Sequence, residues 1–249
     1  MIHIIPLLEG GLIFLTLETF LLKPQWLFYI VGAMSIFIIL GLLIPKQRFL
    51  SGREFWHYLA SPLIFTWSAI VLLTFFENIY FKHFFILSIG TYIFFYFENL
   101  FYYLILGKEK GENNFLRMTN MMNVVSVFFL AVGFYGIKTF LQLPIWILAI
   151  IFFIFGSGLI YSSLWIVKQN LKEIYIEVLA MALIITELFL ATNFLPLGFY
   201  SSGAIVGIIY YIASGILINY LKSKDMAYKR YVFMGSALLL LVILTAKWM

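Results

Sequence analysis

The chain has 249 residues, of which 64% are hydrophobic and 11% carry a charge, and its formal net charge is +5. Soluble domains carry charge on roughly a quarter of their residues, so this composition excludes an ordinary water-soluble domain and indicates a surface that faces a lipid bilayer. The chain has no cysteine, which excludes disulfides, thiolate nucleophiles and cysteine-bound metals. Its basic residues lie in short segments between apolar stretches, which excludes a nucleic-acid groove.

Nine apolar stretches are long enough to cross a bilayer as helices, for which roughly 20 apolar residues are needed. In chain order they are about 4–22, 26–44, 55–76, 84–106, 121–140, 143–167, 174–195, 198–221 and 232–248. The first stretch carries two glutamates and the last is short, so eight spans are the alternative. Membrane β-strands would appear as segments of about ten residues in which apolar and polar residues alternate. The stretches here are continuously apolar and about twice that length. The sequence therefore predicts an all-α, polytopic transmembrane helix bundle.

Short turns separate these stretches. We expect Pro45 to end the second helix, because proline lacks the N–H that a helix needs. The longest connection, about 107–120, has some fourteen residues and is too short to hold a soluble domain. The sequence thus predicts a single integral membrane domain over 1–249.

The distribution of positive charge predicts the orientation. The segments after the second, fourth, sixth and eighth spans hold twelve of the sixteen lysines and arginines. Cytoplasmic loops of membrane proteins carry such an excess of positive charge. We therefore expect a multi-pass protein of a bacterial-type cytoplasmic membrane, with its N-terminus in the cytoplasm.

Ionisable residues inside spans are the best pointers to function, because each costs about 2.5–3.5 kcal/mol at a helix centre. Glu98 lies fourteen residues into the fourth span, which is about 21 Å along a helix. Asn99 is adjacent, Tyr102 is one helical turn further on, and aromatic residues surround all three in the sequence. One interpretation is a site that binds a proton or a ligand. The other is a neutral carboxyl that is hydrogen-bonded to a tyrosine and holds two helices together.

Glu187, in the seventh span, has the same two interpretations. Ala191 lies one turn further along its stripe, and the next span contains a GxxxG pair, Gly203 and Gly207. Small residues mark close helix contacts in membranes. We therefore expect the seventh and eighth spans to pack tightly, with Glu187 turned inward.

The first span contains Glu9 and Glu18, which are nine residues apart and so lie on opposite faces of one helix. Glu9 is near the start of the span, where we expect it to reach the membrane interface. Glu18 is near the other end and is retained as a candidate binding residue, with Lys23, Lys138 or water as its expected partner.

Motif searches exclude several chemistries. Three scattered histidines form no zinc motif, and the single aspartate lies outside the spans, so we predict no metal and no cofactor. The segments PLLEGGLIF (6–14) and ENLFYY (98–103) are slightly similar to the acidic motifs of membrane-embedded lycopene cyclases. Those motifs pair adjacent carboxylates, which both segments lack, so no catalytic residue is carried over.

Three functions fit these features. The first is a small-molecule or proton-coupled transporter, which predicts Glu98 and Glu187 in one polar cavity. The second is an intramembrane enzyme that acts on a lipid or an isoprenoid, with one glutamate as general acid. The third is a structural or assembly subunit of a membrane complex. The expected partners are the lipid bilayer and a small-molecule or lipid ligand, and a homo-oligomer is compatible with the pattern.

Overall fold

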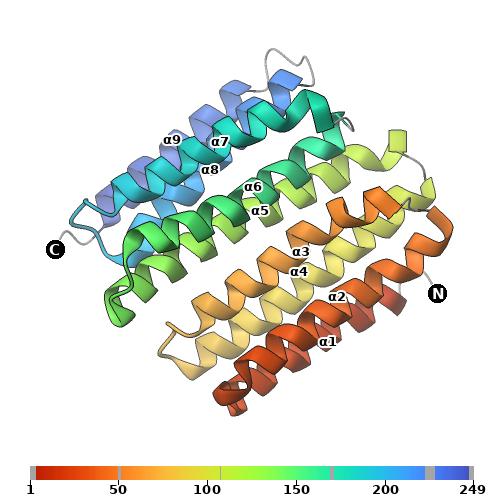
Figure 1. The fold of residues 1–249 in the computed structure, drawn as a ribbon, viewed down its shortest axis with the longest axis horizontal. Coiled ribbons are helices and arrows are strands. Elements are labelled where there is room, and N and C mark those ends of the chain that lie inside the picture. Colours follow the sequence, from red (N-terminus) through yellow and green to blue (C-terminus); the bar gives the residue numbers. More distant parts are fainter. Residues whose placement is uncertain (1–3, 50–51, 107, 169–170, 222–227, 247–249) are drawn as a thin grey trace. The chain divides into compact units, whose positions relative to one another are not determined.

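In the computed structural model, the described residues are 4–49, 52–106, 108–168, 171–221 and 228–246. Within these ranges every regular element is a helix (Figure 1), which confirms the predicted all-α bundle. The elements are α1 Ile4–Leu22, the 3-10 helix η1 Pro24–Trp26, α2 Leu27–Phe49, α3 Gly52–Leu73, α4 Ile79–Leu106, α5 Lys108–Leu141, α6 Ile145–Lys168, α7 Leu171–Thr192, α8 Phe199–Leu221 and α9 Tyr228–Thr245.

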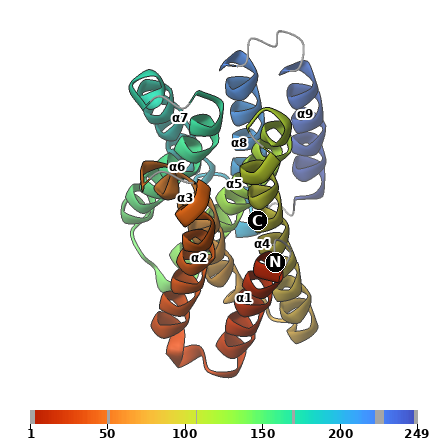
Figure 2. The ribbon, with the colours of Figure 1, turned by 90° about the vertical axis from the view of Figure 1, so that its right-hand side faces the viewer.

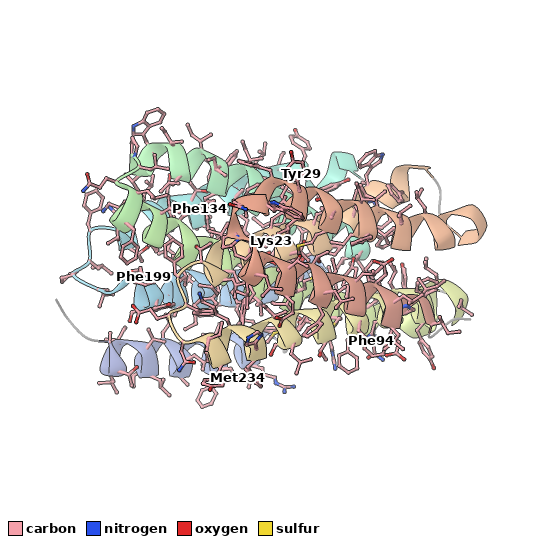
Figure 3. The ribbon with its side chains drawn as sticks, turned by 90° about the horizontal axis from the view of Figure 1, so that it is seen from below. Lys23, Tyr29, Phe94, Phe134, Phe199 and Met234 are labelled. Atoms are coloured by element: carbon pink, nitrogen blue, oxygen red, sulfur yellow. The ribbon has the colours of Figure 1, made fainter. Side chains whose placement is uncertain are left out.

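Eight of these helices, α1 to α8, are long and apolar enough to cross a membrane. Eight of the nine predicted spans are therefore confirmed as helices of that kind, while α9 falls outside the set among the described residues. Large apolar side chains cover the outer faces of the helices, such as Tyr29 on α2, which is 78% exposed (Figure 3). Such faces suit contact with lipid, and the chain is a multi-pass membrane protein.

Two predicted helix ends are wrong. The polar segment expected to be a loop, about 107–120, is mostly the beginning of α5, which starts at Lys108. Lysine and glutamate are good helix formers, so polarity here marks where the helix leaves the apolar layer and not where it ends. Pro45 does not end α2 either, because the helix continues to Phe49. A proline removes one backbone hydrogen bond, and the helix continues past that loss.

The chain divides into two compact units, 1–119 and 120–249, and the boundary falls within α5. We call them the N-terminal unit and the C-terminal unit and describe each by itself. The prediction of one membrane domain over 1–249 stays a prediction.

In the N-terminal unit, α1 packs against both α2 and α4. Figure 2 shows α1 and α2 as neighbours joined by a short turn. The contact with α4 is made backbone to backbone: a Cβ atom on Gly10 would lie only 2.7 Å from the carbonyl oxygen of Gly90. Glycines at crossing points let membrane helices approach this closely.

A proline inside α3 creates a second specific contact in this unit. Pro62 lacks an N–H, so it cannot donate the usual helical hydrogen bond to the carbonyl of Tyr58, four residues earlier. The hydroxyl of Tyr96 on α4 donates a hydrogen bond to this carbonyl at 2.9 Å. The broken helical bond is thus replaced by a bond between helices, as the apolar medium requires.

In the C-terminal unit, aromatic rings stack between α5, α6 and α7. The ring of Phe189 lies 4.6 Å from those of both Tyr135 and Phe152, centroid to centroid. The hydroxyl of Tyr135 donates to the carbonyl of Phe189 at 2.6 Å. Near the end of α5, Lys138 donates to the side chain of Asn193 at 2.6 Å, so this cation is bound by the protein.

Candidate functional site

Glycines bring α8 close to α5 and α9 in the C-terminal unit. A Cβ on Gly203 would lie 2.8 Å from the backbone nitrogen of Val132, and one on Gly207 would lie 3.0 Å from the Cβ of Phe128, both on α5. The GxxxG motif of α8 therefore faces α5. The predicted packing of the seventh and eighth spans is also present, because α7 and α8 are in contact. The sequence had assigned the GxxxG motif to that contact, because the spacing of small residues along a helix does not reveal which helix they meet.

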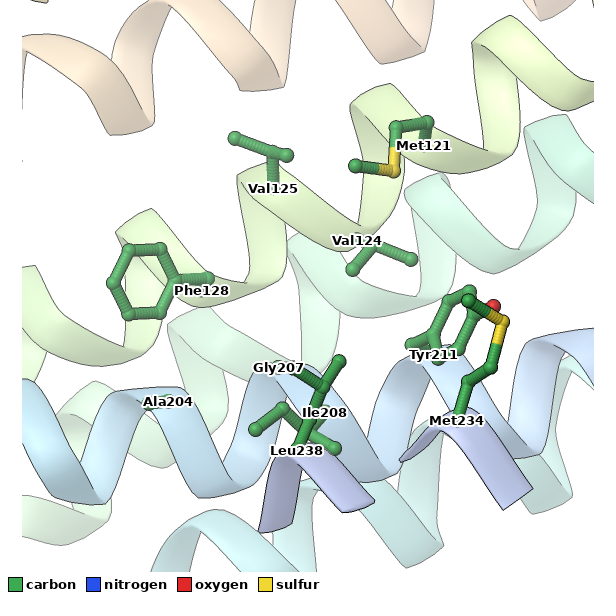
Figure 4. A pocket seen from close by; sticks show the side chains of 10 residues that line it. All are labelled: Met121, Val124, Val125, Phe128, Ala204, Gly207, Ile208, Tyr211, Met234 and Leu238. Carbon is green, nitrogen blue, oxygen red and sulfur yellow. The ribbon is translucent and has the colours of Figure 1, made fainter. Parts of the chain in front are cut away.

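An apolar groove lies where α5, α8 and α9 meet (Figure 4), and we call it the α5–α8–α9 groove. Its volume is about 380 Å³. The lining residues are Met121, Val124, Val125, Phe128, Ala204, Gly207, Ile208, Tyr211, Met234 and Leu238. Gly207 forms part of the wall, so the missing side chain at this position both permits the helix contact and adds room.

One end of the groove carries its polar groups. Tyr211 is the only lining residue with a hydroxyl, and its ring lies 5.3 Å from that of Tyr231 on α9, centroid to centroid. Tyr211 is also close enough to Arg230 to interact with its charge. Figure 4 shows Tyr211 and Met234 at one end of the groove, away from Phe128 and Ala204. The groove thus runs from a polar end into an apolar interior.

A second groove, of about 240 Å³, lies between α1 and α4 in the N-terminal unit. It surrounds the Gly10–Gly90 contact, and its other lining residues include Leu7, Phe14 and Phe94. The lining contains one hydroxyl group, on Thr91, and that hydroxyl donates to the carbonyl of Leu87 within α4.

A buried polar cluster in the C-terminal unit was missed by the sequence analysis. The amide of Asn123 on α5 donates to the carbonyl of Leu159 at 2.8 Å and to the hydroxyl of Ser163 at 2.7 Å, both on α6. The signal was available as an asparagine within a span and a serine pair in the next. No basic or acidic side chain takes part in these bonds, so they tie α5 to α6 and provide no nucleophile with its base.

The three candidates of the fourth span lie on α4 in the N-terminal unit. Glu98 is half-buried and interacts with a neighbour. The amide of Asn99 donates to the carbonyl of Phe95 on its own helix at 2.8 Å, and Tyr102 is 57% exposed. None of the three lines either groove. Their role as a binding site stays a prediction.

Glu187 and Ala191 are exposed on α7, so Glu187 is not turned inward as expected. The face that α7 buries is instead formed by larger residues such as Met181, Ile185 and Phe189. Glu187 belongs to the C-terminal unit and Glu98 to the N-terminal unit. That they share a cavity stays a prediction.

The two glutamates of α1 lie in different surroundings, and the role of Glu18 as a binding residue stays a prediction. The Oε1 atom of Glu18 lies 2.9 Å from the Nδ1 atom of His83 on α4, and the side chain of Glu18 is 23% exposed. Glu9 was expected at the interface, but it is buried, with 5% exposed. Its carboxyl lies against Gly41 of α2, and its Oε2 atom has no hydrogen-bond partner in the described part of the chain. Packing between α1 and α2, which spacing alone does not report, causes this difference.

Among the described residues, no group of three or more histidine, aspartate or glutamate side chains is placed to hold a metal ion. No family model, curated protein or solved structure matches this chain. The fold and its grooves define a multi-pass helical membrane protein with two apolar recesses between its helices.

Proposed function

We propose that this protein binds the hydrocarbon chain of a lipid or a similar amphiphile in the α5–α8–α9 groove. The observation that carries the proposal is a recess of about 380 Å³ with an apolar lining and a single hydroxyl at one end. Small-molecule sites are roughly 300–1,000 Å³ in volume, so this groove suits one slender chain better than a bulky polar solute.

The surrounding medium explains why a chain would occupy the groove. Lipid tails are as apolar as leucine, so no hydrophobic force drives a hydrocarbon chain from the bilayer into the protein. An unfilled recess, however, loses dispersion contacts along its walls, and a chain of matching width restores them. Met121 and Met234 stand in the wall, and methionine adapts its shape to irregular ligands.

The polar end supports an amphiphile over a plain hydrocarbon. Tyr211 carries the only hydroxyl of the lining, and the positive charge of Arg230 at the start of α9 acts on it. A chain that lies along Val124 and Ile208 would place its polar end beside this pair.

The residues that line the groove favour lipid binding over two of the predicted functions, transport and catalysis. No carboxylate lies in the groove, and neither Glu98 nor Glu187 lines it. A catalytic acid and a proton carrier are therefore not placed against the bound chain. Transport and catalysis stay predictions for this protein.

A photoactivatable lipid tests the proposal. Purified full-length protein is reconstituted with a phosphatidylcholine that carries a diazirine in its acyl chain, irradiated and digested. We expect crosslinks to concentrate on peptides of α5, α8 and α9. Filling the groove with Ala204→Phe or Leu238→Trp should lower this labelling about fivefold, which corresponds to roughly 1 kcal/mol.

Leu240→Trp is the matched control, because Leu240 is exposed on α9 but does not line the groove. It should leave labelling unchanged. Equal labelling of the outer faces of α1 and α2, with no effect of the filling substitutions, would show that the groove is ordinary lipid-facing surface.

A further inference from the structure

Glu9 is a buried carboxyl within a membrane-spanning helix that no proposed function uses. It lies five residues after the start of α1, which is about 8 Å along the helix at 1.5 Å per residue. The whole of α1, Ile4–Leu22, is apolar enough to cross a membrane. Only 5% of Glu9 is exposed, which makes it the most deeply buried of the acidic residues that the structure describes.

Gly41 on α2 provides the space that this side chain fills. A Cβ atom at Gly41 would lie 2.6 Å from Cδ and 2.7 Å from Oε1 of Glu9, closer than atoms can approach. Any larger residue at position 41 would therefore displace the carboxyl. Gly10, the next residue along α1 and about 100° round the helix, is in backbone contact with Gly90 and Phe94 of α4. Both α2 and α4 therefore pack closely against the part of α1 that carries Glu9.

Within the part of the chain that the structure describes, no cation forms an ion pair with the carboxyl of Glu9. Its carboxyl lies against Gly41 of α2, and the adjacent residue Gly10 lies against Gly90 and Phe94 of α4. None of these three carries an ionisable group. Oε2 also has no hydrogen-bond partner among the described residues. An ionised carboxylate that is buried without a partner costs several kcal/mol, and taking up a proton removes that cost.

We propose that Glu9 is a proton-binding site inside the bilayer, a carboxylic acid that stays neutral while α1 and α2 are packed at Gly41. A metal ion is the alternative occupant. It would need further ligands around it, and the described histidine, aspartate and glutamate residues form no group of three that could hold a metal ion. The proposal is independent of the lipid-binding groove, because Glu9 and the groove lie in different units.

Reaction with dicyclohexylcarbodiimide tests whether the carboxyl holds a proton. The acid proton moves to a carbodiimide nitrogen, the carboxylate oxygen bonds to the central carbon, and the acyl group then migrates to nitrogen, so no atom is lost. The reagent partitions into lipid and needs a protonated acid. We expect the full-length protein in liposomes to carry about tenfold more label on Glu9 than on Glu18, because Glu9 is buried whereas Glu18 is paired with His83.

Three controls make the labelling decisive. Glu9→Gln should remove the label from its peptide, and a water-soluble carbodiimide should reverse the preference in favour of Glu18. Labelling of Glu9 should decrease at alkaline pH. Suppression of the label by sodium ions at constant pH would identify a cation site and overturn the proposal.

Thermal unfolding gives a second measurement that does not depend on access of the reagent. A carboxyl that stays neutral in the folded state but ionises in the unfolded state makes the folded state less stable as pH rises. The wild-type midpoint should therefore fall with pH more steeply than that of Glu9→Gln, and the two should be equal in mild acid. Parallel curves, together with absence of label, would overturn the proposal.

Discussion

At the scale of single residues, depth within a span proved a poor guide to burial. Glu187 and Glu9 are both acidic residues in spanning helices, yet Glu187 is exposed on α7 and Glu9 is buried against α2. The sequence predicted the opposite, with Glu187 turned inward and Glu9 at the membrane interface, because a sequence directly gives only the position of a residue along the helix axis. The direction in which a side chain points relative to a neighbouring helix is set by packing.

The Tyr96–Tyr58 hydrogen bond gives a prediction at this scale. Tyr96→Phe removes this donor on the neighbouring helix, so we expect a loss of about 0.6 kcal/mol, the average for hydrogen bonds between membrane helices, and at most about 1.7 kcal/mol. Pro62→Ala restores the N–H that can satisfy the carbonyl of Tyr58 within α3.

The cost of Tyr96→Phe should therefore become close to zero in the Pro62→Ala background. Thermal unfolding of the four proteins, wild type, both single variants and the double variant, measures this coupling. Equal costs in both backgrounds would show that the proline does not create the need for the bond.

At the scale of helices, sequence patterns identified the elements but not their neighbours. The GxxxG motif of α8 was recognised as a packing surface, and it meets α5 at Val132 and Phe128. On α7, by contrast, Ala191 is exposed. A smooth stripe permits close approach, but which helix occupies it depends on the packing of every other helix in the unit.

Glycine substitutions test this contact. Gly203→Ala places a Cβ 2.3 Å from Cγ2 of Val132 and 2.8 Å from its backbone nitrogen, and backbone cannot move aside as a flexible side chain can. We expect a destabilisation of about 1–3 kcal/mol, as for other overpacked interiors. Gly156→Ala is the matched control, because nothing lies within 4 Å of the added atom. It should be neutral or stabilising, and thermal unfolding in detergent measures both.

The length of α5 gives a second prediction for an element. Asn114 is exposed and lies in the part of α5 that the sequence assigned to a loop. Asn114→Pro should cost about 3 kcal/mol because it breaks a helix interior, whereas Asn114→Ala should have little effect. If both variants unfold at the wild-type temperature, this segment behaves as a loop.

At the scale of the whole molecule, lysines and arginines are concentrated in every second connecting segment. This distribution predicts which segments lie in the cytoplasm, and the fold does not test that prediction. The chain has no cysteine, so in a single-cysteine variant a thiol reagent can label only the introduced residue. Phe194 follows α7 and is 82% exposed, while Tyr220 lies at the end of α8 and is 78% exposed.

A membrane-impermeant thiol reagent should label Phe194→Cys from outside intact cells. Tyr220→Cys should react only after the membrane is opened, because positive loops lie in the cytoplasm. Labelling of both positions from the same side would contradict the predicted topology.

The sequence by itself determined the class and the elements. Apolar stretches of about 20 residues must satisfy their backbone groups internally in lipid, so they must be helices, and α1 has the predicted ends. Tertiary structure decided the rest: that Glu9 is buried on Gly41, that Gly207 opens a groove beside α5, and that Tyr96 bonds to the carbonyl freed by Pro62. These features join residues far apart in the chain. In a uniformly apolar sequence almost every face of every helix is compatible with burial, so only the packed arrangement selects among them.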